Sequence, residues 1–270
     1  MGLALYHLGH AALARGDYEG TLEHYRSLRE YAEAAGDKLY LARLPNLFGG
    51  VSLEIFDLDE AIRLNTEGDE TSRRLWPWPE PRGHSLWKLG LAQLYRGNHG
   101  SAERAFREAE SLRELDNWGR WTWESSLWRS RGELSLAEDK YEEAWTWASR
   151  ALEAATQCRQ RKHAARALRL QGQILAAQGR LEDAAQALTA SLDQACMLGT
   201  ARESWIGQAA LGNVFTRLGR DTEAEAQLTA AAHTIESIAA KLVTPQLRRS
   251  FLAAERVADV FQTLDRTPPG

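Results

Sequence analysis

The chain has 270 residues, of which 44% are hydrophobic and 26% charged, with a formal net charge of −4. This composition supplies enough apolar surface for a large core, and the mild negative charge argues against binding to nucleic acid. The sequence shows no apolar stretch near the roughly 18 residues of a membrane-spanning helix and no charged-then-apolar signal at its start, so we expect a cytoplasmic protein without a membrane partner.

Six glycines recur at one phase of a repeating pattern. Each lies in a stretch that otherwise reads as helix, where glycine costs about 1 kcal/mol relative to alanine. Because this cost occurs six times at one phase, we look for a shared structural cause. The pattern predicts that two helices come into close contact once in every repeat, and that the repeats form a solenoid. The six glycines, spaced 40 to 42 residues apart, are Gly9, Gly49, Gly90, Gly132, Gly172 and Gly212.

A small residue follows each of these glycines after eleven or twelve positions, and a larger residue often comes four positions later. Between glycine and small residue lies a break, where a left-handed residue can end a helix. Units two and four have Phe56 and Asp139 at this break in place of glycine. The pattern predicts a helical hairpin whose two helices cross at small residues. The small residues are Thr21, Ala61, Ala102, Ala144, Ala184 and Ala224; the larger ones include Tyr25, Phe106, Leu188 and Leu228; the break glycines are Gly16, Gly97, Gly179 and Gly219.

The register of these residues resembles the tetratricopeptide repeat (TPR) family over residues 3–241. The period of about 40 departs from the usual 34 of that family. The resemblance implies an all-α, right-handed superhelical solenoid of six TPR-like helical hairpins followed by a capping helix. The signature is clearest in unit three, with Leu86, Leu89, Gly90, Ala102, Phe106 and Ala109, and in unit four, with Trp128, Gly132, Tyr141, Ala144, Ala148 and Ala151.

Both ends of the array carry their own signals. Leu3, Leu5 and Leu8 begin a helical pattern almost at Met1, and we expect an exposed apolar face there to promote self-association of the N-terminal repeat. At the other end, Thr244 and Pro245 are typical of a helix start. We expect repeats over 2–40, 41–80, 82–121, 122–161, 162–201 and 202–241, a capping helix over 242–266 and a disordered tail over 267–270.

Longer units of this kind are similar to the arrays in the C-terminal parts of large bacterial signalling ATPases, including cyclase-linked ones and MalT-like or LuxR-type regulators. This resemblance implies a sensing or scaffolding segment related to a multidomain regulator. It rests on the segments 45–49 (PNLFG), 57–61 (DLDEA), 65–68 (NTEG) and 247–252 (LRRSFL).

Motifs typical of enzymes are absent: the sequence has no phosphate-binding loop, no nucleophile elbow, no His-Glu-x-x-His pair and no Cys-x-x-Cys. We therefore expect no catalytic residues, no cofactor and no metal. His7, His10 and His24 permit a metal site, but zinc needs a fuller ligand set, so we interpret them as ordinary surface or groove histidines. Cys158 and Cys196 are expected to be reduced core residues.

Function is expected on the first helix of each unit, which lines the concave surface in TPR proteins. Positions flanking the packing glycine there form a basic and aromatic set, which does not reproduce the Lys/Asn clamp of TPR chaperone adaptors. The candidate ligand-binding residues are Tyr6, His10, Arg43, Asn46, His84, Trp87, Lys88, Arg129, Glu133, Arg166, Arg169, Gln173 and Asn213.

Residues 154–181 contain six bases and no acid, and Lys162, Arg166 and Arg169 share one helical face there. Two interpretations stand at this point: a stripe that binds an acidic or phosphorylated segment, or a solvated face paired with acids of a neighbouring helix. Nine of the ten tryptophans lie between positions 76 and 147. Most are expected in packing between repeats, with Trp87 as an apolar anchor for a ligand.

The sequence thus favours a non-catalytic scaffold that binds a protein or peptide. The alternative is a small-ligand sensor within a transcriptional or cyclase-type regulator. An open groove would favour the peptide, and a closed pocket lined by tryptophan would favour the small ligand.

Overall fold

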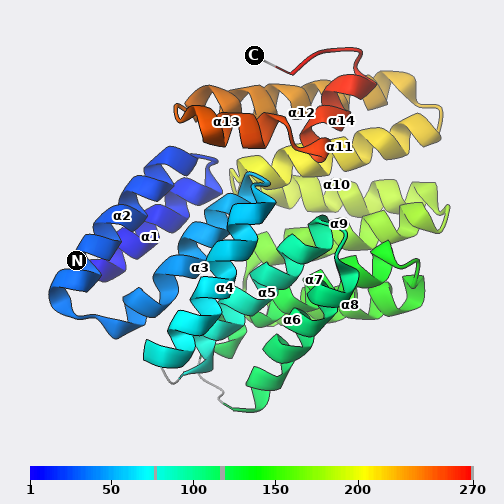
Figure 1. Ribbon diagram of the computed structural model, residues 1–270. Coiled ribbons are helices and arrows are strands. Elements are labelled where there is room, and N and C mark those ends of the chain that lie inside the picture. The colour runs from blue at the N-terminus through cyan, green and yellow to red at the C-terminus, as the bar shows by residue number, and fades with distance from the viewer. Residues whose placement is uncertain (76–77, 116–118, 269–270) are drawn as a thin grey trace. The chain divides into compact units, whose positions relative to one another are not determined.

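The protein is all-α, as expected, in a computed structural model that describes residues 1–75, 78–115 and 119–268 (Figure 1). Its chain divides into two compact units. The N-terminal unit comprises Met1–Leu13 and Asp17–Ser130, and the C-terminal unit comprises Ala14–Gly16 and Arg131–Gly270.

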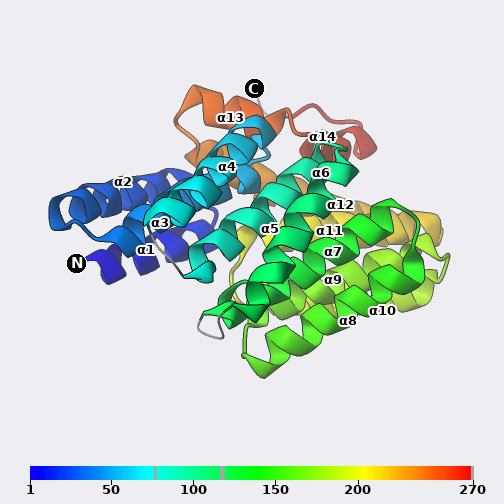
Figure 2. The same ribbon diagram turned by 60° about the horizontal axis from the view of Figure 1, so that its bottom comes forward.

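Twelve helices follow one another as six helical hairpins, which confirms the predicted solenoid of TPR-like repeats. Odd-numbered helices are the first members of the hairpins and even-numbered helices the second. Figure 2 shows α3 to α6 side by side in the N-terminal unit. The helices are α1 (Gly2–Ala14), α2 (Tyr18–Ala35), α3 (Lys38–Glu54), α4 (Leu58–Leu75), α5 (Pro79–Tyr95), α6 (His99–Ser111), α7 (Glu124–Ala137), α8 (Tyr141–Gln157), α9 (Arg161–Ala177), α10 (Leu181–Met197), α11 (Ala201–Arg217) and α12 (Asp221–Lys241).

Each hairpin turn contains one residue in the left-handed conformation. The four predicted glycines adopt it, with φ between 72° and 80°. Phe56 and Asp139 adopt it as well, with φ of 62° and 56°. A side chain disfavours this conformation by about 1–2 kcal/mol. The hairpin geometry therefore imposes the same turn even where the sequence does not supply glycine.

Inside the hairpins, the repeated glycine faces the residue sixteen positions later on the second helix. A methyl group at Gly172 would lie 2.6 Å from Cγ of Leu188, and one at Gly9 would overlap the ring of Tyr25. Real Cβ atoms do not approach this closely, so the crossing requires glycine. The same pairing recurs as Gly90 with Phe106 and Gly212 with Leu228.

In units two and four, a different kind of residue packs against the repeated glycine. In unit two the partner of Gly49 is the fully buried Asn65, whose Nδ2 donates to the Ala61 carbonyl at 2.7 Å. Unit four has a small alanine sixteen positions after Gly132. There, Leu170 of α9 fills the space, and its Cδ2 would lie 2.7 Å from a methyl group at Gly132. In every hairpin a side chain thus packs closely against the repeated glycine, but the residue that supplies this side chain differs between units.

The end of the chain differs from the expected single capping helix. Two short helices follow α12, namely α13 (Pro245–Leu252) and α14 (Glu255–Thr263), because Ala254 adopts an extended conformation between them. Thr244 and Pro245 begin the first of these, as predicted. Buried Phe251, Val257 and Phe261 supply the apolar stripe. Residues 269–270 of the expected tail lie outside the described residues, and its disorder stays a prediction.

Leucines on the first helix are exposed, as expected for that end of the array. Leu3 is 62% and Leu8 50% accessible. Self-association through this face stays a prediction. Among the described helices, none combines the length and the apolar character needed to cross a bilayer.

Substitution of Gly132 tests the packing role of the repeated glycine. We expect Gly132→Leu to lower the free energy of unfolding by about 1–3 kcal/mol or more, because overpacking forces Leu170 and the α8 backbone apart. Gly100→Leu is the control, since a Cβ at Gly100 meets no atom within 4 Å. Urea denaturation followed by circular dichroism measures both; equal stability of the two variants would contradict the packing role.

Candidate functional site

All thirteen predicted ligand-binding residues lie on the first helices of the hairpins, but six of them are buried. This corrects the expectation that positions flanking the glycine face solvent. Partners of the buried residues Lys88, Arg166 and Arg169 belong to the first helix of an adjacent hairpin, so these side chains are used between repeats. The six, each at most 9% exposed, are Asn46, Trp87, Lys88, Arg129, Arg166 and Arg169.

Lys88 of α5 is bound to α3 in the N-terminal unit. Its Nζ donates to both the backbone oxygen and the Oδ1 of Asn46, each at 2.9 Å. Burial lowers the pKa of Lys88 to about 7, although the carboxylates of Glu80 and Glu54 act in the opposite direction. An ammonium and a neutral amine both have two N–H groups for these bonds. Lys88 therefore joins two repeats and is not presented to an outside partner.

Four other predicted residues of the N-terminal unit form a strip across α1, α3 and α5 around the buried Glu80. The rings of Tyr6 and His10 lie 4.4 Å apart, and the Arg43 guanidinium lies 5.4 Å from the centre of the Tyr6 ring. Arg43 Nε donates to Glu80 Oε2 at 3.0 Å. His84 Nε2 lies 3.4 Å from Glu80 Oε1. The strip is partly accessible, yet its charges are engaged with one another.

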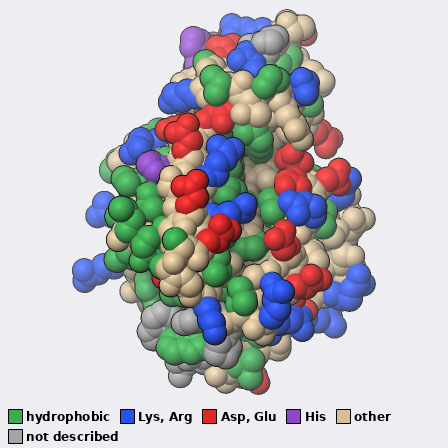
Figure 3. All heavy atoms as spheres, turned by 60° about the vertical axis from the view of Figure 1, so that its left-hand side comes forward, with side chains coloured by type: hydrophobic (Ala, Val, Ile, Leu, Met, Phe, Trp, Pro, Cys, Tyr) green, Lys and Arg blue, Asp and Glu red, His purple; other side chains and the backbone are tan. Residues whose placement is uncertain are grey.

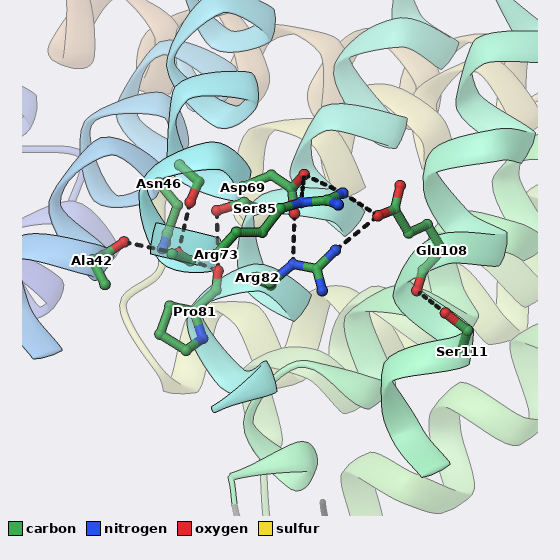
Figure 4. A network of polar contacts seen from close by, with 11 residues as sticks. Ala42, Asn46, Asp69, Arg73, Pro81, Arg82, Ser85, Glu108 and Ser111 are labelled. Atoms are coloured by element: carbon green, nitrogen blue, oxygen red, sulfur yellow. Dashed lines mark hydrogen bonds and ion pairs between the residues drawn. The ribbon is translucent and has the colours of Figure 1, made fainter. Parts of the chain in front are cut away.

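A second polar network joins α4, α5 and α6 (Figure 4). The Asp69 carboxylate accepts from Arg73 Nε and Arg82 Nε, both at 2.9 Å. Glu108 accepts from Arg82 Nη2 at 2.7 Å and also from Arg73. Two arginines and two carboxylates thus neutralise one another and fix both second helices to α5. No sequence motif predicts a role for these four residues.

In the C-terminal unit, two arginines of the predicted basic stripe bind a single buried carboxylate. Arg166 Nε donates to Glu203 Oε1 at 2.6 Å, and Arg169 Nη1 donates to Glu203 Oε2 at 2.5 Å. Arg202 Nη1 lies 3.7 Å from the same carboxylate. Burial alone would raise the pKa of Glu203, but the charges of Arg166, Arg169 and Arg202 outweigh it and hold that pKa well below its usual value.

These contacts decide between the two interpretations of the acid-free stretch. Arg166 and Arg169 pair with an acid of the neighbouring helix α11, so their assignment as a solvent-facing anion site is wrong; the pair is buried and not solvated as the alternative assumed. Glu133 of α7 acts on the same cluster, because its charge raises the pKa of Arg169 while burial, the larger cause, lowers it. Arg159 and Arg161, from the same stretch, are exposed.

Gln173 and Asn213, the last two predicted residues, line a cavity of about 170 Å³ in the C-terminal unit. They follow the packing glycines of α9 and α11 by one position, so they are equivalent residues of successive repeats. Trp205 and Ile206 of α11 contribute a buried apolar wall. Arg256 and Asp259 of α14 border the same cavity and are exposed. Two of the predicted ligand-binding residues thus line one cavity, whereas the continuous groove stays a prediction.

Sequence reasoning missed the acids that hold the array together, although a signal existed. Arg43 and Glu80 are 37 residues apart, and so are Arg166 and Glu203. This separation is the repeat period less about one helical turn, which places the two side chains opposite each other on successive first helices. An arginine with an acid 37 positions later is therefore a recognisable pattern for a bond between repeats.

The tryptophans agree with the predicted packing role, and the cysteines do so only in part. Trp123, Trp128 and Trp205 are almost fully buried, in agreement with a packing role, whereas Trp76 and Trp118 lie outside the described residues. Both cysteines are free, but they are exposed and not in the core. Among the described residues, no cluster of His, Cys, Asp or Glu could hold a metal ion. One face of the molecule mixes acidic, basic and hydrophobic side chains (Figure 3).

Comparison with solved structures places the chain among helical-repeat proteins. The structure of a Rap protein complexed with Competence and Sporulation Factor matches with a TM-score of 0.64 and 14% identity, covering 97% of this chain and 75% of that one. BtubC from P. vanneervenii matches with a TM-score of 0.56 and 16% identity, covering 87% and 92%. At these identities the likeness shows the fold alone. No protein-family model and no curated protein sequence matches the chain.

The buried Glu203 cluster predicts a dependence of stability on pH. Because the folded-state pKa of Glu203 lies below its unfolded value near 4.5, the carboxylate stabilises the fold above that value, and this contribution is lost as the pH falls through the folded pKa. We expect Glu203→Gln to cost about 3–5 kcal/mol at pH 7, since it leaves arginines buried without their partner. Urea titrations from pH 7 to 3 should show the difference from wild type shrinking below about pH 4.5; a constant difference would contradict this.

The lowered pKa of Lys88 predicts a second dependence of stability on pH, between pH 7 and pH 10. The folded-state pKa of about 7 lies below the ordinary lysine value of 10.5, so the unfolded chain binds more protons between these values. Stability should therefore rise from pH 7 to pH 10 in wild type. In Lys88→Met this rise should disappear, because methionine does not titrate. Thermal denaturation of both proteins across this range measures it, and identical pH profiles would exclude a lowered pKa of Lys88.

Proposed function

We propose that the chain is a non-catalytic scaffold that binds a protein or peptide segment, and that it serves as the interaction segment of a bacterial signalling or regulatory protein. The observation that carries this is the cavity between equivalent residues of α9 and α11. Its location on the first helices is where the resemblance to TPR proteins places ligand binding. The fold likeness to Rap, whose structure is a complex with a factor, is in keeping with this role.

The chemistry of the cavity suits a peptide. The side-chain amides of Gln173 and Asn213 each offer two N–H donors and a carbonyl acceptor, which complement the N–H and C=O groups of a peptide backbone. Trp205 and Ile206 provide an apolar wall for one side chain. Asp259 adds an exposed acidic group at the rim. The cavity can thus hold one residue of an extended segment by both its backbone and its side chain.

The size of the cavity at Gln173 and Asn213 weighs against a drug-sized small ligand at that place. Sites for drug-sized molecules typically measure about 300–1,000 Å³. The cavity at Gln173 and Asn213 measures about 170 Å³, and its rim is accessible at Asn213. A free amino acid would fit, since Arg256 and Asp259 offer charges of both signs. Thermal-shift measurements with the twenty free amino acids test this second candidate, and a rise in melting temperature with one of them would favour it.

The peptide proposal is tested with Gln173→Ala combined with Asn213→Ala. An array of random twelve-residue peptides identifies binders of the wild-type chain, and fluorescence anisotropy gives their affinities. Loss of two to four hydrogen bonds, each about 0.5–1.5 kcal/mol, should weaken binding at least about fivefold. Melting temperature should hardly change, because both residues lie at the surface of the cavity.

A matched control removes two amides from second helices of the same unit, with Gln186→Ala and Gln227→Ala. These residues lie on α10 and α12, away from the lining of the cavity. Peptides that bind both double variants equally would show that the cavity is not the site. Absence of any binding peptide in the array would overturn the scaffold proposal itself.

A further inference from the structure

We propose that the C-terminal unit has a second binding site, which takes an acidic peptide segment carrying a bulky apolar side chain. The site is a recess of about 510 Å³ at the ends of α8 and α10 and the start of α9. It shares no lining residue with the cavity at Gln173 and Asn213. The inference rests on the proposed scaffold role and names a partner class for it.

The floor of the recess is apolar and unusually accessible. Ala155 and Ala164 line it, together with Met197 and Leu198, which are 77% and 37% exposed. Large accessible apolar groups gathered at one place mark interaction sites in soluble proteins. Methionine is common at surfaces that bind peptides, because its unbranched side chain adapts to different partners. The recess is therefore suited to an apolar side chain of a partner.

Two arginines at the rim give the site its charge. Arg159 and Arg161 are exposed, and within the part of the chain that the structure describes neither forms an ion pair. The recess has no carboxylate among its lining residues. Two other exposed arginines, Arg63 and Arg180, instead pair with an acid three residues away, each at 2.6 Å. The net positive rim calls for a carboxylate from a partner.

Backbone conformation sets Arg159 apart from the residues at two corresponding turns. The residue has φ of 54°, in the turn between α8 and α9. The corresponding turns before α3 and α11 use Gly36 and Gly199, both with φ of 62°. A side chain costs about 1–2 kcal/mol in this conformation, and such strain concentrates at functional positions. Arg159 thus occupies a turn where glycine would be less strained, so its replacement by glycine can be tested without loss of the turn.

The test begins with a phage library of random twelve-residue peptides selected on the full chain. We expect enrichment of sequences that place Asp or Glu beside Leu, Ile, Met or Phe. Their affinity, measured by fluorescence anisotropy, should fall at least tenfold in Arg159→Gln with Arg161→Gln, and should weaken as salt is raised. Met197→Ser should weaken the same peptides, because it removes part of the apolar floor.

Arg159→Gly separates binding from folding. It removes the guanidinium and relieves the strained turn, so it should weaken binding while the melting temperature stays the same or rises. The control for charge is Arg15→Gln with Arg26→Gln, which removes two exposed arginines of the first repeat and should leave the peptides bound. Equal loss in this control would reduce the effect to net charge and overturn the site.

Other outcomes also decide the matter. Enriched peptides without acids, or acidic peptides that bind the Arg159 and Arg161 double variant with full affinity, would overturn the inference. Peptides lost only in the Gln173 and Asn213 double variant would leave the proposed function standing and remove this second site. If laurate binds at the recess and no library peptide does, the ligand is an acyl anion, and the peptide proposal is wrong.

Discussion

Close contact between the two helices of a hairpin is the constraint from which the rest of the fold follows. The first helix can approach the second only where a glycine leaves room for the side chain sixteen positions later, as Gly172 does for Leu188. Small buried residues such as Ala184 keep the second helix equally close. Because each hairpin is formed in this way, its first helix presents a fixed face to the next hairpin, and successive repeats can be joined by side chains at fixed register.

Polar bonds then link the first helices in succession. Arg43 bonds to Glu80, and Arg166 bonds to Glu203, with the same separation of 37 residues. Such buried pairs are poor sources of net stability, because desolvation offsets much of the attraction. Their contribution is specificity of register, since any slip of one helix against the next would leave a charge buried without a partner. We regard this as the physical reason why charged residues occupy positions that would otherwise be apolar.

Because charged side chains pair with one another between repeats, fewer of them are accessible to a ligand than the sequence implies. Groups already paired inside the array are not accessible to a ligand, which removes Lys88, Arg166 and Arg169 from the binding surface. Two accessible places of a different kind are the cavity with Gln173 and Asn213 and the recess with Arg159 and Arg161. Both are in the C-terminal unit, and both combine an apolar wall with polar groups at the rim.

The sequence by itself determined the repeat, its period and the hairpin turns, because glycine spacing and small residues report local helix geometry directly. It also located the first helices and the thirteen residues on them. Only the tertiary structure decided which of those residues face solvent, since exposure depends on the neighbouring hairpin and not on the helix that carries the residue. Glu203 is one example, because the spacing of 37 residues from Arg166 acquires its meaning only when α11 packs beside α9 and brings the carboxylate to Arg166 and Arg169. Phe56 is another, because its left-handed turn is imposed by the packing of two helices rather than by its own preference.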